Sequence, residues 1–134
     1  SMSPGEVICD YKGKYTSLKV LPFEDASREV SLEGSLVSEY EGRRNGTEAG
    51  TVYWRQAADG SATLSYCGVL TTTDGEVVFI KGRGMGAVTD QGQTRVRATV
   101  TSQTTSQQLA WLNITIATCE GEGDFSEAVG KFHV

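Results

Sequence analysis

Aromatic side chains with polar neighbours are the residues in this sequence that could do chemistry. The aromatic set is Tyr40, Tyr53, Trp54, Tyr66, Phe79 and Trp111. By alternation along an extended chain, Ser38 shares a face with Tyr40, Gln56 with Trp54, Asn113 with Trp111, and Lys81 and Arg83 with Phe79. If these faces meet, the aromatics either fill a core or wall a pocket. Polar side chains among them favour the pocket, because a buried polar group needs a partner.

In such a pocket we expect Tyr66, Arg83 and Asn113 to polarise a substrate carbonyl by hydrogen bonding, as catalytic residues. The substrate-binding walls are expected to be Tyr40, Trp54, Phe79 and Trp111. The alternative for Arg83 and Lys81 is an outward, solvated position. Of the carboxylates, Glu39, Glu41 and Glu48 lie near one predicted rim, where a glutamate of raised pKa would serve as an acid or base. Their spacing singles out none of them.

The sequence lacks the residue patterns that metal sites, catalytic triads and phosphate-binding loops require. The only histidine is His133, so histidine-based zinc sites and catalytic triads have no parts to draw on. No acidic cluster has the spacing of a calcium loop. The GxGxG run Gly82–Gly86 precedes no helical pattern, so we interpret it as glycines that let a strand bend rather than as a phosphate cradle. We therefore expect no metal and no cofactor.

Length and charge restrict the setting. The chain has 134 residues and a net charge of -5, which fits one domain and disfavours nucleic acid and anionic membranes as partners. The three cysteines are an odd number, no pair has CxxC spacing and no signal peptide is visible. These features predict a reducing, cytoplasmic location, with one disulfide plus a free thiol as the alternative. Cys67 and Cys119 are expected to be small buried hydrophobes.

The secondary-structure pattern is all-β. Asn-Gly and Asp-Gly turn signals recur between alternating runs, which predicts consecutive hairpins. Residues 1–13 are expected to be a flexible N-terminal segment with Ser1-Met2 as a tag remnant, residues 22–27 a loop and 41–48 a mobile rim. The predicted strands are 14–21, 28–40, 50–57, 61–71, 76–84, 93–103, 109–119 and 125–134. Eight strands without a covering helix predict a closed antiparallel up-and-down barrel with a central cavity.

One predicted strand is apolar on both faces. In residues 109–119, Leu112, Ile114 and Ile116 alternate with Trp111, Asn113 and Thr115. Because the outer face of such a strand would need cover, it indicates a homo-oligomer, with a dimer as the first expectation.

Several segments resemble a family of small, largely uncharacterised β-barrel proteins. They are Asn45–Thr51, Asp59-Gly60, Gly68–Glu76, Gly82–Gly86 and Leu109–Asn113, and the likeness covers roughly residues 28–134. Such barrels are similar to the group of allene oxide cyclase, dirigent and spirotetronate cyclase proteins. The resemblance implies a closed barrel with an apolar cavity, often a dimer or trimer, that folds a flexible substrate without a metal or nucleotide. No catalytic motif of those enzymes can be placed on this sequence, so the implied activity is analogy at the level of the fold.

Two functional hypotheses follow. The first is a cofactor-independent cyclase or isomerase that acts on a small hydrophobic metabolite of the kind made in natural-product biosynthesis. The alternative is a non-catalytic, lipocalin-like protein that binds a lipophilic small molecule. A barrel with a filled core that works through its outer surface would exclude both.

Overall fold

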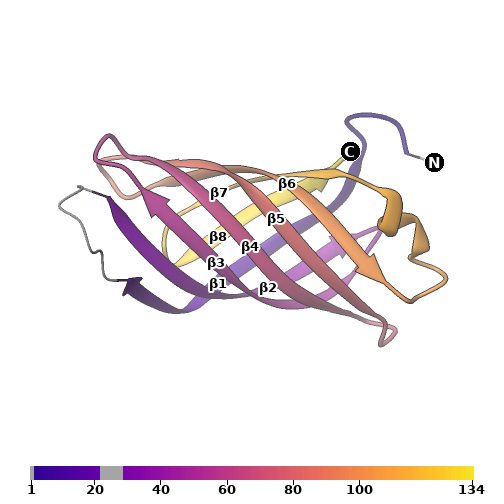
Figure 1. Cartoon of the computed structure of the whole chain (residues 1–134). Coiled ribbons are helices and arrows are strands. Elements are labelled where there is room, and N and C mark those ends of the chain that lie inside the picture. Colours follow the sequence, from indigo (N-terminus) through magenta and orange to yellow (C-terminus); the bar gives the residue numbers. More distant parts are fainter. Residues whose placement is uncertain (1, 22–28) are drawn as a thin grey trace.

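Eight antiparallel strands follow one another around a closed barrel in the computed structural model, which describes residues 2–21 and 29–134 (Figure 1). Each strand pairs with its neighbours in sequence, and β8 closes the ring on β1. The predicted up-and-down barrel is confirmed. The strands are β1 (Val7–Leu21), β2 (Val30–Gly42), β3 (Gly46–Gln56), β4 (Ser61–Thr72), β5 (Val77–Val88), β6 (Thr94–Thr104), β7 (Ala117–Gly123) and β8 (Glu127–His133).

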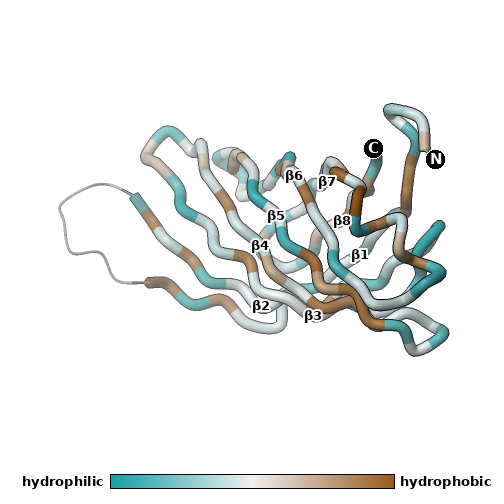
Figure 2. The backbone as a smooth tube through the Cα atoms, turned by 45° about the vertical axis from the view of Figure 1, so that its right-hand side comes forward, coloured by the Kyte–Doolittle hydropathy of each residue, from teal (hydrophilic) through white to brown (hydrophobic). Residues whose placement is uncertain are grey.

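Burial alternates along the strands, as on β2 and β5, because successive side chains point to opposite faces of the barrel wall. Hydrophobic and hydrophilic residues follow one another along the strands in the same way (Figure 2). On β2, Ser38 and Tyr40 are buried while Glu39 is exposed. On β5, Ile80 is 1% exposed and its neighbour Phe79 is 57% exposed. This parity decides which residues of each strand can contribute to an internal site.

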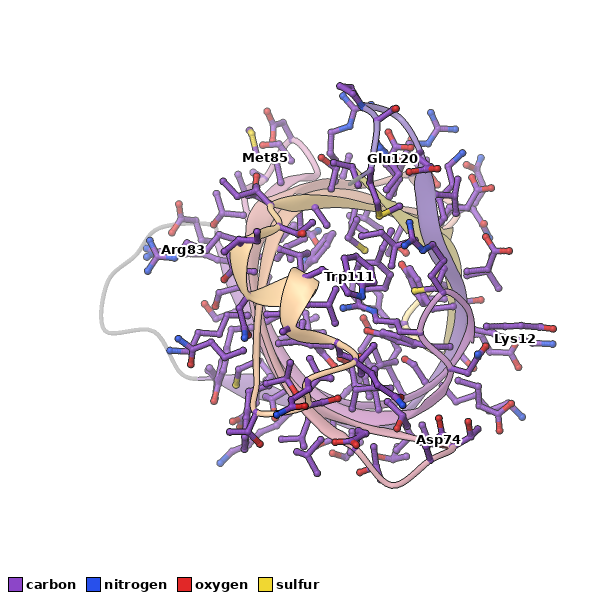
Figure 3. All side chains as sticks on the ribbon, turned by 90° about the vertical axis from the view of Figure 1, so that its right-hand side faces the viewer. Lys12, Asp74, Arg83, Met85, Trp111 and Glu120 are labelled. Carbon is purple, nitrogen blue, oxygen red and sulfur yellow. The ribbon has the colours of Figure 1, made fainter. Side chains whose placement is uncertain are left out.

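The two ends of the barrel differ. One end carries the β2–β3 turn at 43–45, the β4–β5 turn at 73–76, both termini, and the long β6–β7 connection with the 3-10 helix η1 (Ala110–Ile114) (Figure 1). Figure 3 looks onto this end and shows Trp111 across it, while Arg83 and Glu120 point outward. The other end carries the turns at 57–60, 89–93 and 124–126.

The strand predicted over 109–119 is wrong in its first half, where the chain forms η1, and β7 begins only at Ala117. Leu112 is 2% exposed and packs into the barrel end, whereas Ile114 is 90% and Ile116 68% exposed. The three residues therefore share no strand face, and the argument for a subunit covering that face loses its basis.

Local hydrogen bonds explain the helical turn. The side chain of Asn113 accepts from the backbone N–H of Thr104 at 2.8 Å and donates to its carbonyl at 3.0 Å. The Thr115 hydroxyl donates to the carbonyl of Trp111 at 2.6 Å. These side chains bind backbone groups that a strand ladder would otherwise use.

Other segment boundaries also differ from those predicted from the sequence. β1 begins at Val7, so residues 7–13 belong to the barrel. The predicted mobile rim over 41–48 is a tight hairpin, since β2 ends at Gly42, β3 starts at Gly46, and the Gly42 N–H donates to Asn45 Oδ1 at 2.8 Å. The predicted loop over 22–27 lies outside the described residues.

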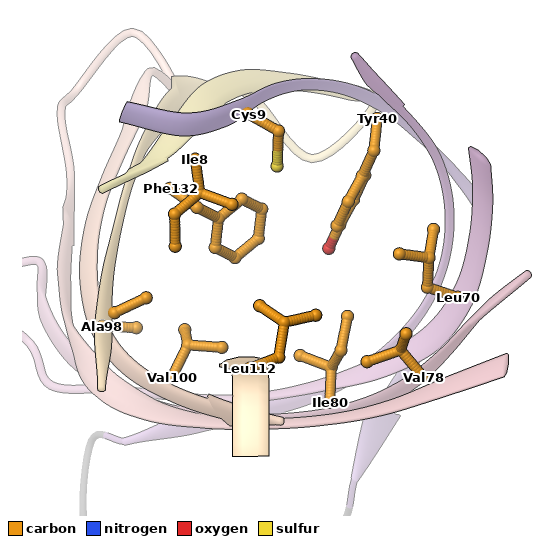
Figure 4. Packing of buried hydrophobic residues seen from close by; sticks show 11 residues of the cluster. Ile8, Cys9, Tyr40, Leu70, Val78, Ile80, Ala98, Val100, Leu112 and Phe132 are labelled. Atoms are coloured by element: carbon orange, nitrogen blue, oxygen red, sulfur yellow. The ribbon is translucent and has the colours of Figure 1, made fainter. Parts of the chain in front are cut away.

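The η1 end of the barrel is filled by packed side chains (Figure 4). The most deeply buried hydrophobic residues of this cluster are Ile8, Cys9, Leu70, Val78, Ile80 and Leu112. They seal one end, so an internal cavity is left in the part of the barrel that lies away from η1.

Candidate functional site

A cavity of about 90 Å³ lies inside the barrel. Its wall is mainly apolar and includes Leu36, Val52, Trp54, Leu64, Val96 and Phe125. The polar side chains that reach it include Ser38, Tyr40, Glu48 and Tyr66. This volume is well below the roughly 300–1,000 Å³ of pockets for drug-sized ligands.

Inward-facing glycines make room for the large aromatic side chains. A Cβ atom at Gly68 would lie 2.5 Å from the Tyr66 hydroxyl, and one at Gly50 would collide with the same group. A Cβ atom at Gly86 would lie 2.7 Å from the Trp54 indole. Gly86 belongs to the GxGxG run, so this glycine of the run provides space for the Trp54 ring inside the barrel.

Glu48 is the buried carboxyl group that lines the cavity. It follows the β2–β3 turn on β3, points inward and is 2% exposed. Burial raises the pKa of its carboxyl group. The hydroxyls of Tyr66 and Tyr40, which lie beside it without hydrogen-bond geometry, and the charge of Arg44 counter this only in part. Glu48 Oε2 is buried and has no hydrogen-bond partner among the described residues.

Two tyrosine hydroxyls are, like Glu48 Oε2, buried without a hydrogen-bond partner among the described residues. Tyr40 is 4% exposed, its hydroxyl points to the barrel interior (Figure 4), and neither it nor the Tyr66 hydroxyl has a hydrogen-bond partner in the described part of the chain. Burial, followed by the nearby charge of Glu48, raises the pKa of Tyr40 and of Tyr66 far above the usual value. Both hydroxyls therefore remain protonated and able to donate.

Arg44 provides a buried positive charge beside this group. It comes from the β2–β3 turn, is 2% exposed and donates from Nη1 to the Ser102 hydroxyl at 3.3 Å. Its guanidinium carbon stacks 5.0 Å from the ring centre of Tyr40 and 4.6 Å from that of Phe132. The Nε and Nη2 atoms are buried without a partner among residues 2–21 and 29–134.

The three cysteines differ in burial. Cys119 lines the cavity, but burial raises its pKa to about 12, so it stays a thiol. Cys9 is buried and burial raises its pKa too. Cys67 is exposed, contrary to the expectation of a buried residue, because its position on β4 faces outward. All three are free.

Of the seven residues named from sequence, Tyr40, Trp54 and Tyr66 line the cavity together. Phe79 and Arg83 are exposed on the outer face of β5, whose inner face holds Val78, Ile80 and glycines. The other two are in η1. Asn113 is exposed and binds Thr104, and Trp111 lies under the Arg43 guanidinium, 4.9 Å from ring centre to carbon.

Glu48 and Arg44 are not among the seven site residues predicted from the sequence. A signal for Glu48 existed, because positions 48 and 54 share a strand face and Trp54 was assigned inward. Arg44 had no such signal, since the side chain of a turn residue has no fixed direction.

In the part of the chain that the structure describes, no three His, Cys, Asp or Glu side chains are placed to hold a metal ion. Nor does that part contain a helix long and apolar enough to cross a membrane.

Comparison with known proteins yields matches among solved structures. No family model matches the chain, and no curated protein matches it. The structure is similar to a β-barrel-like protein from Acinetobacter baumannii, with TM-score 0.84, 14% identity, and 99% of this chain and 97% of that one covered. It is similar to a protein of unknown function from Clostridium acetobutylicum, with TM-score 0.83, 18% identity and 97% of both chains covered.

An enzyme from Penicillium herquei is a more distant structural neighbour, with TM-score 0.62, 15% identity, and 99% of this chain and 98% of that one covered. At these identities the likeness concerns the fold. The comparisons support the expected class of small β-barrel proteins and do not extend to a particular cyclase family.

Proposed function

We propose that this protein is a cofactor-independent isomerase or cyclase that moves a proton on a small hydrophobic substrate inside the barrel. One observation carries the proposal. Glu48 is a buried carboxyl group of raised pKa with an unpartnered oxygen, beside the unpartnered hydroxyls of Tyr40 and Tyr66 in an apolar cavity. Perturbed groups that converge in a cavity are typical of acid–base sites.

In this mechanism Glu48 removes a proton from the carbon next to a substrate carbonyl. Tyr40 and Tyr66 donate hydrogen bonds to the carbonyl oxygen as negative charge develops there. In an isomerase, Glu48 returns the proton to a different carbon. In a cyclase, the enolate carbon bonds to an electrophilic alkene carbon of the same molecule, and the new enolate takes the proton back. The raised pKa brings Glu48 closer to the operating pH, which suits both steps.

Only some of the seven site residues predicted from the sequence take part in this mechanism. Tyr66 keeps its proposed catalytic role, Trp54 shapes the cavity, and Tyr40 moves from wall to hydrogen-bond donor. Arg83, Asn113, Phe79 and Trp111 have no part in the proposal, because none of them reaches the cavity. The three free thiols suit the proposed cytoplasmic location. A homodimer stays a prediction, to be tested by sedimentation velocity.

The test uses 3-cyclohexenone, a one-ring probe whose isomerisation to 2-cyclohexenone raises the ultraviolet absorbance. We expect turnover by the wild type and a loss of about a hundredfold or more in Glu48→Gln. Glu39→Gln is the matched control, since Glu39 is exposed on the outer face of β2 and should leave the rate unchanged. Binding of the probe without conversion would favour the alternative of a non-catalytic binder for lipophilic molecules, which the apolar cavity wall also supports.

A further inference from the structure

The cavity's buried polar atoms that lack a hydrogen-bond partner collect at its inner end. Glu48 is the third residue of β3 and Tyr40 the third from the end of β2, so both lie close to the β2–β3 turn at the end that η1 covers. Tyr66 lies in the middle of β4, further from the η1 end than Glu48 and Tyr40. Its phenol lies over Gly50 and Gly68, which brings the hydroxyl toward Glu48. The three unpartnered atoms therefore face one part of the cavity.

The opposite end of the cavity is aromatic. Trp54 lies two residues before the end of β3, and Phe125 lies in the β7–β8 turn. Their rings meet edge to face, with centres 5.6 Å apart and planes at 88°. The Trp54 indole N–H donates to Gln56 Oε1 at 3.0 Å and is thus already occupied. The rest of the wall combines aliphatic side chains, among them Leu36, Val52 and Val96, with the rings of Tyr11 and Tyr15.

This division indicates what a ligand must supply. The protonated tyrosine hydroxyls call for an oxygen that accepts hydrogen bonds, because a buried polar group without a partner is costly. An anionic ligand would meet the Glu48 carboxylate, while the buried Arg44 guanidinium is stacked on Tyr40 and Phe132 and does not line the cavity. The small volume limits the rigid body of the ligand to about one ring.

We propose that the cavity takes neutral, one-ring carbonyl compounds with the oxygen toward Glu48, Tyr40 and Tyr66 and the apolar end toward Trp54 and Phe125, and that it rejects their carboxylate counterparts. This inference rests on the proposed function and deepens it by naming the substrate class and its orientation. It concerns binding, so it can be tested without turnover.

The first experiment measures binding of three probes by protein-observed NMR titration: cyclohexanone, benzene and cyclohexanecarboxylate. We expect Tyr66→Phe and Tyr40→Phe each to weaken cyclohexanone binding about threefold to tenfold, the effect of one lost hydrogen bond. Benzene makes no such bond, so its affinity should stay the same or increase, and its binding also shows that the cavity of each variant is intact. Cyclohexanecarboxylate should bind at least tenfold more weakly than cyclohexanone at neutral pH.

The inference is overturned if wild-type protein does not bind cyclohexanone, if the tyrosine variants weaken benzene as much as cyclohexanone, or if the carboxylate binds as tightly as the ketone. Orientation is tested with 4-methylcyclohexanone and intermolecular nuclear Overhauser effects. The methyl group should contact the Trp54 ring and the protons next to the carbonyl should contact the Tyr66 ring. The reversed pattern would refute the orientation.

The two proposals fail in different ways. Oxygen-inward binding of cyclohexanone without conversion of 3-cyclohexenone would leave the ligand class standing and overturn the catalytic function. Conversion of 3-cyclohexenone that depends on Glu48, together with ketone binding that ignores Tyr40 and Tyr66, would keep the catalytic function and overturn this inference.

Discussion

The guanidinium carbon of Arg44 lies 4.6 Å from the centre of the Phe132 ring, and both residues are almost completely buried inside the barrel. A cation held against aromatic rings loses hydration and gains the attraction of the ring face. Here it also acts on Glu48, since the Arg44 charge lowers the pKa that burial raises. The hairpin turn between β2 and β3 thus contributes to the electrostatics of the cavity.

Arg44→Met should raise the pKa of Glu48 further. The variant keeps an apolar stem of similar length and removes the charge that favours the carboxylate. A carbon-13 NMR titration of the Glu48 carboxyl group measures the shift directly. Arg44→Lys keeps a positive charge and should give a Glu48 pKa between those of the wild type and Arg44→Met. Arg43→Met, at the half-exposed neighbouring position, should leave the Glu48 titration as in the wild type. An unchanged Glu48 titration in Arg44→Met would contradict the proposed coupling.

The stability of the protein should depend on pH through Glu48. Its pKa in the folded state is raised above the ordinary value of 4.5, so the folded state holds this proton more tightly than the unfolded state. By linkage, the wild type should lose free energy of unfolding relative to Glu48→Gln as the pH rises from the ordinary value through the raised one. Urea denaturation of both proteins across this range measures the difference, and parallel stability curves would argue against a raised pKa.

Leu112→Ala should destabilise the barrel strongly. The side chain is 2% exposed and packs into the core at the end that η1 covers, so its loss leaves a cavity and should lower the free energy of unfolding by about 2–5 kcal/mol. Ile114→Ala is the matched control two residues away, where 90% exposure predicts almost no change. Equal effects of the two substitutions in urea denaturation would mean that η1 does not seal the barrel as described.

Gly50→Ala should displace the phenol of Tyr66. An added Cβ atom would collide with the Tyr66 hydroxyl and lie 2.7 Å from the carbonyl oxygen of Cys67, so the ring must move and the strands must shift. We expect a loss of about 1–3 kcal/mol in stability and weaker cyclohexanone binding. Gly82→Ala is the control, since its Cβ atom would come no closer than 3.4 Å to any neighbour. Cyclohexanone binding by Gly50→Ala at wild-type strength would separate Tyr66 from the site.

Alkylation should distinguish the three cysteines. Cys67 is exposed, whereas burial raises the pKa of Cys9 and takes that of Cys119 to about 12. Because the thiolate is the reactive form, iodoacetamide under native conditions should label Cys67 first and leave the other two. Peptide mapping by mass spectrometry reads the order. Labelling of Cys119 as fast as Cys67 would show that the cavity opens to reagents and that the thiol is more acidic than its burial implies.

The barrel could be predicted because its signals are local. Asp59-Gly60 and Asp74-Gly75 each lie at the tip of a hairpin, with the glycine at positive φ, as an Asp-Gly turn demands. Alternation along β2 correctly placed Tyr40 on the inner face. Over 109–119 the strand prediction is wrong, because Asn113 and Thr115 bind nearby backbone groups and the apolar run forms η1.

The site was less accessible to this reasoning. Tyr66 and Trp54 were placed correctly by type and parity, but Phe79 and Arg83 depended on which face of β5 turns inward, and one residue of offset reverses that choice. The inward position of Glu48 could have been predicted because it shares a strand face with Trp54. A glutamate on a strand is usually solvated, however, so its residue type argued against that position.

The amino-acid sequence alone determined that this chain forms hairpins, closes into an eight-stranded barrel and carries aromatic residues for its interior. These outcomes follow from turn residues and from a two-residue period, both of which act over a few neighbours. Only the tertiary structure decided that Arg44, Glu48, Tyr40 and Tyr66 share one buried, incompletely hydrogen-bonded space. Their meeting depends on the register across β2, β3 and β4 and on glycines that face Tyr66 from β3 and β4. The electrostatics that follow come from burial, which is a property of the closed barrel and of no single strand.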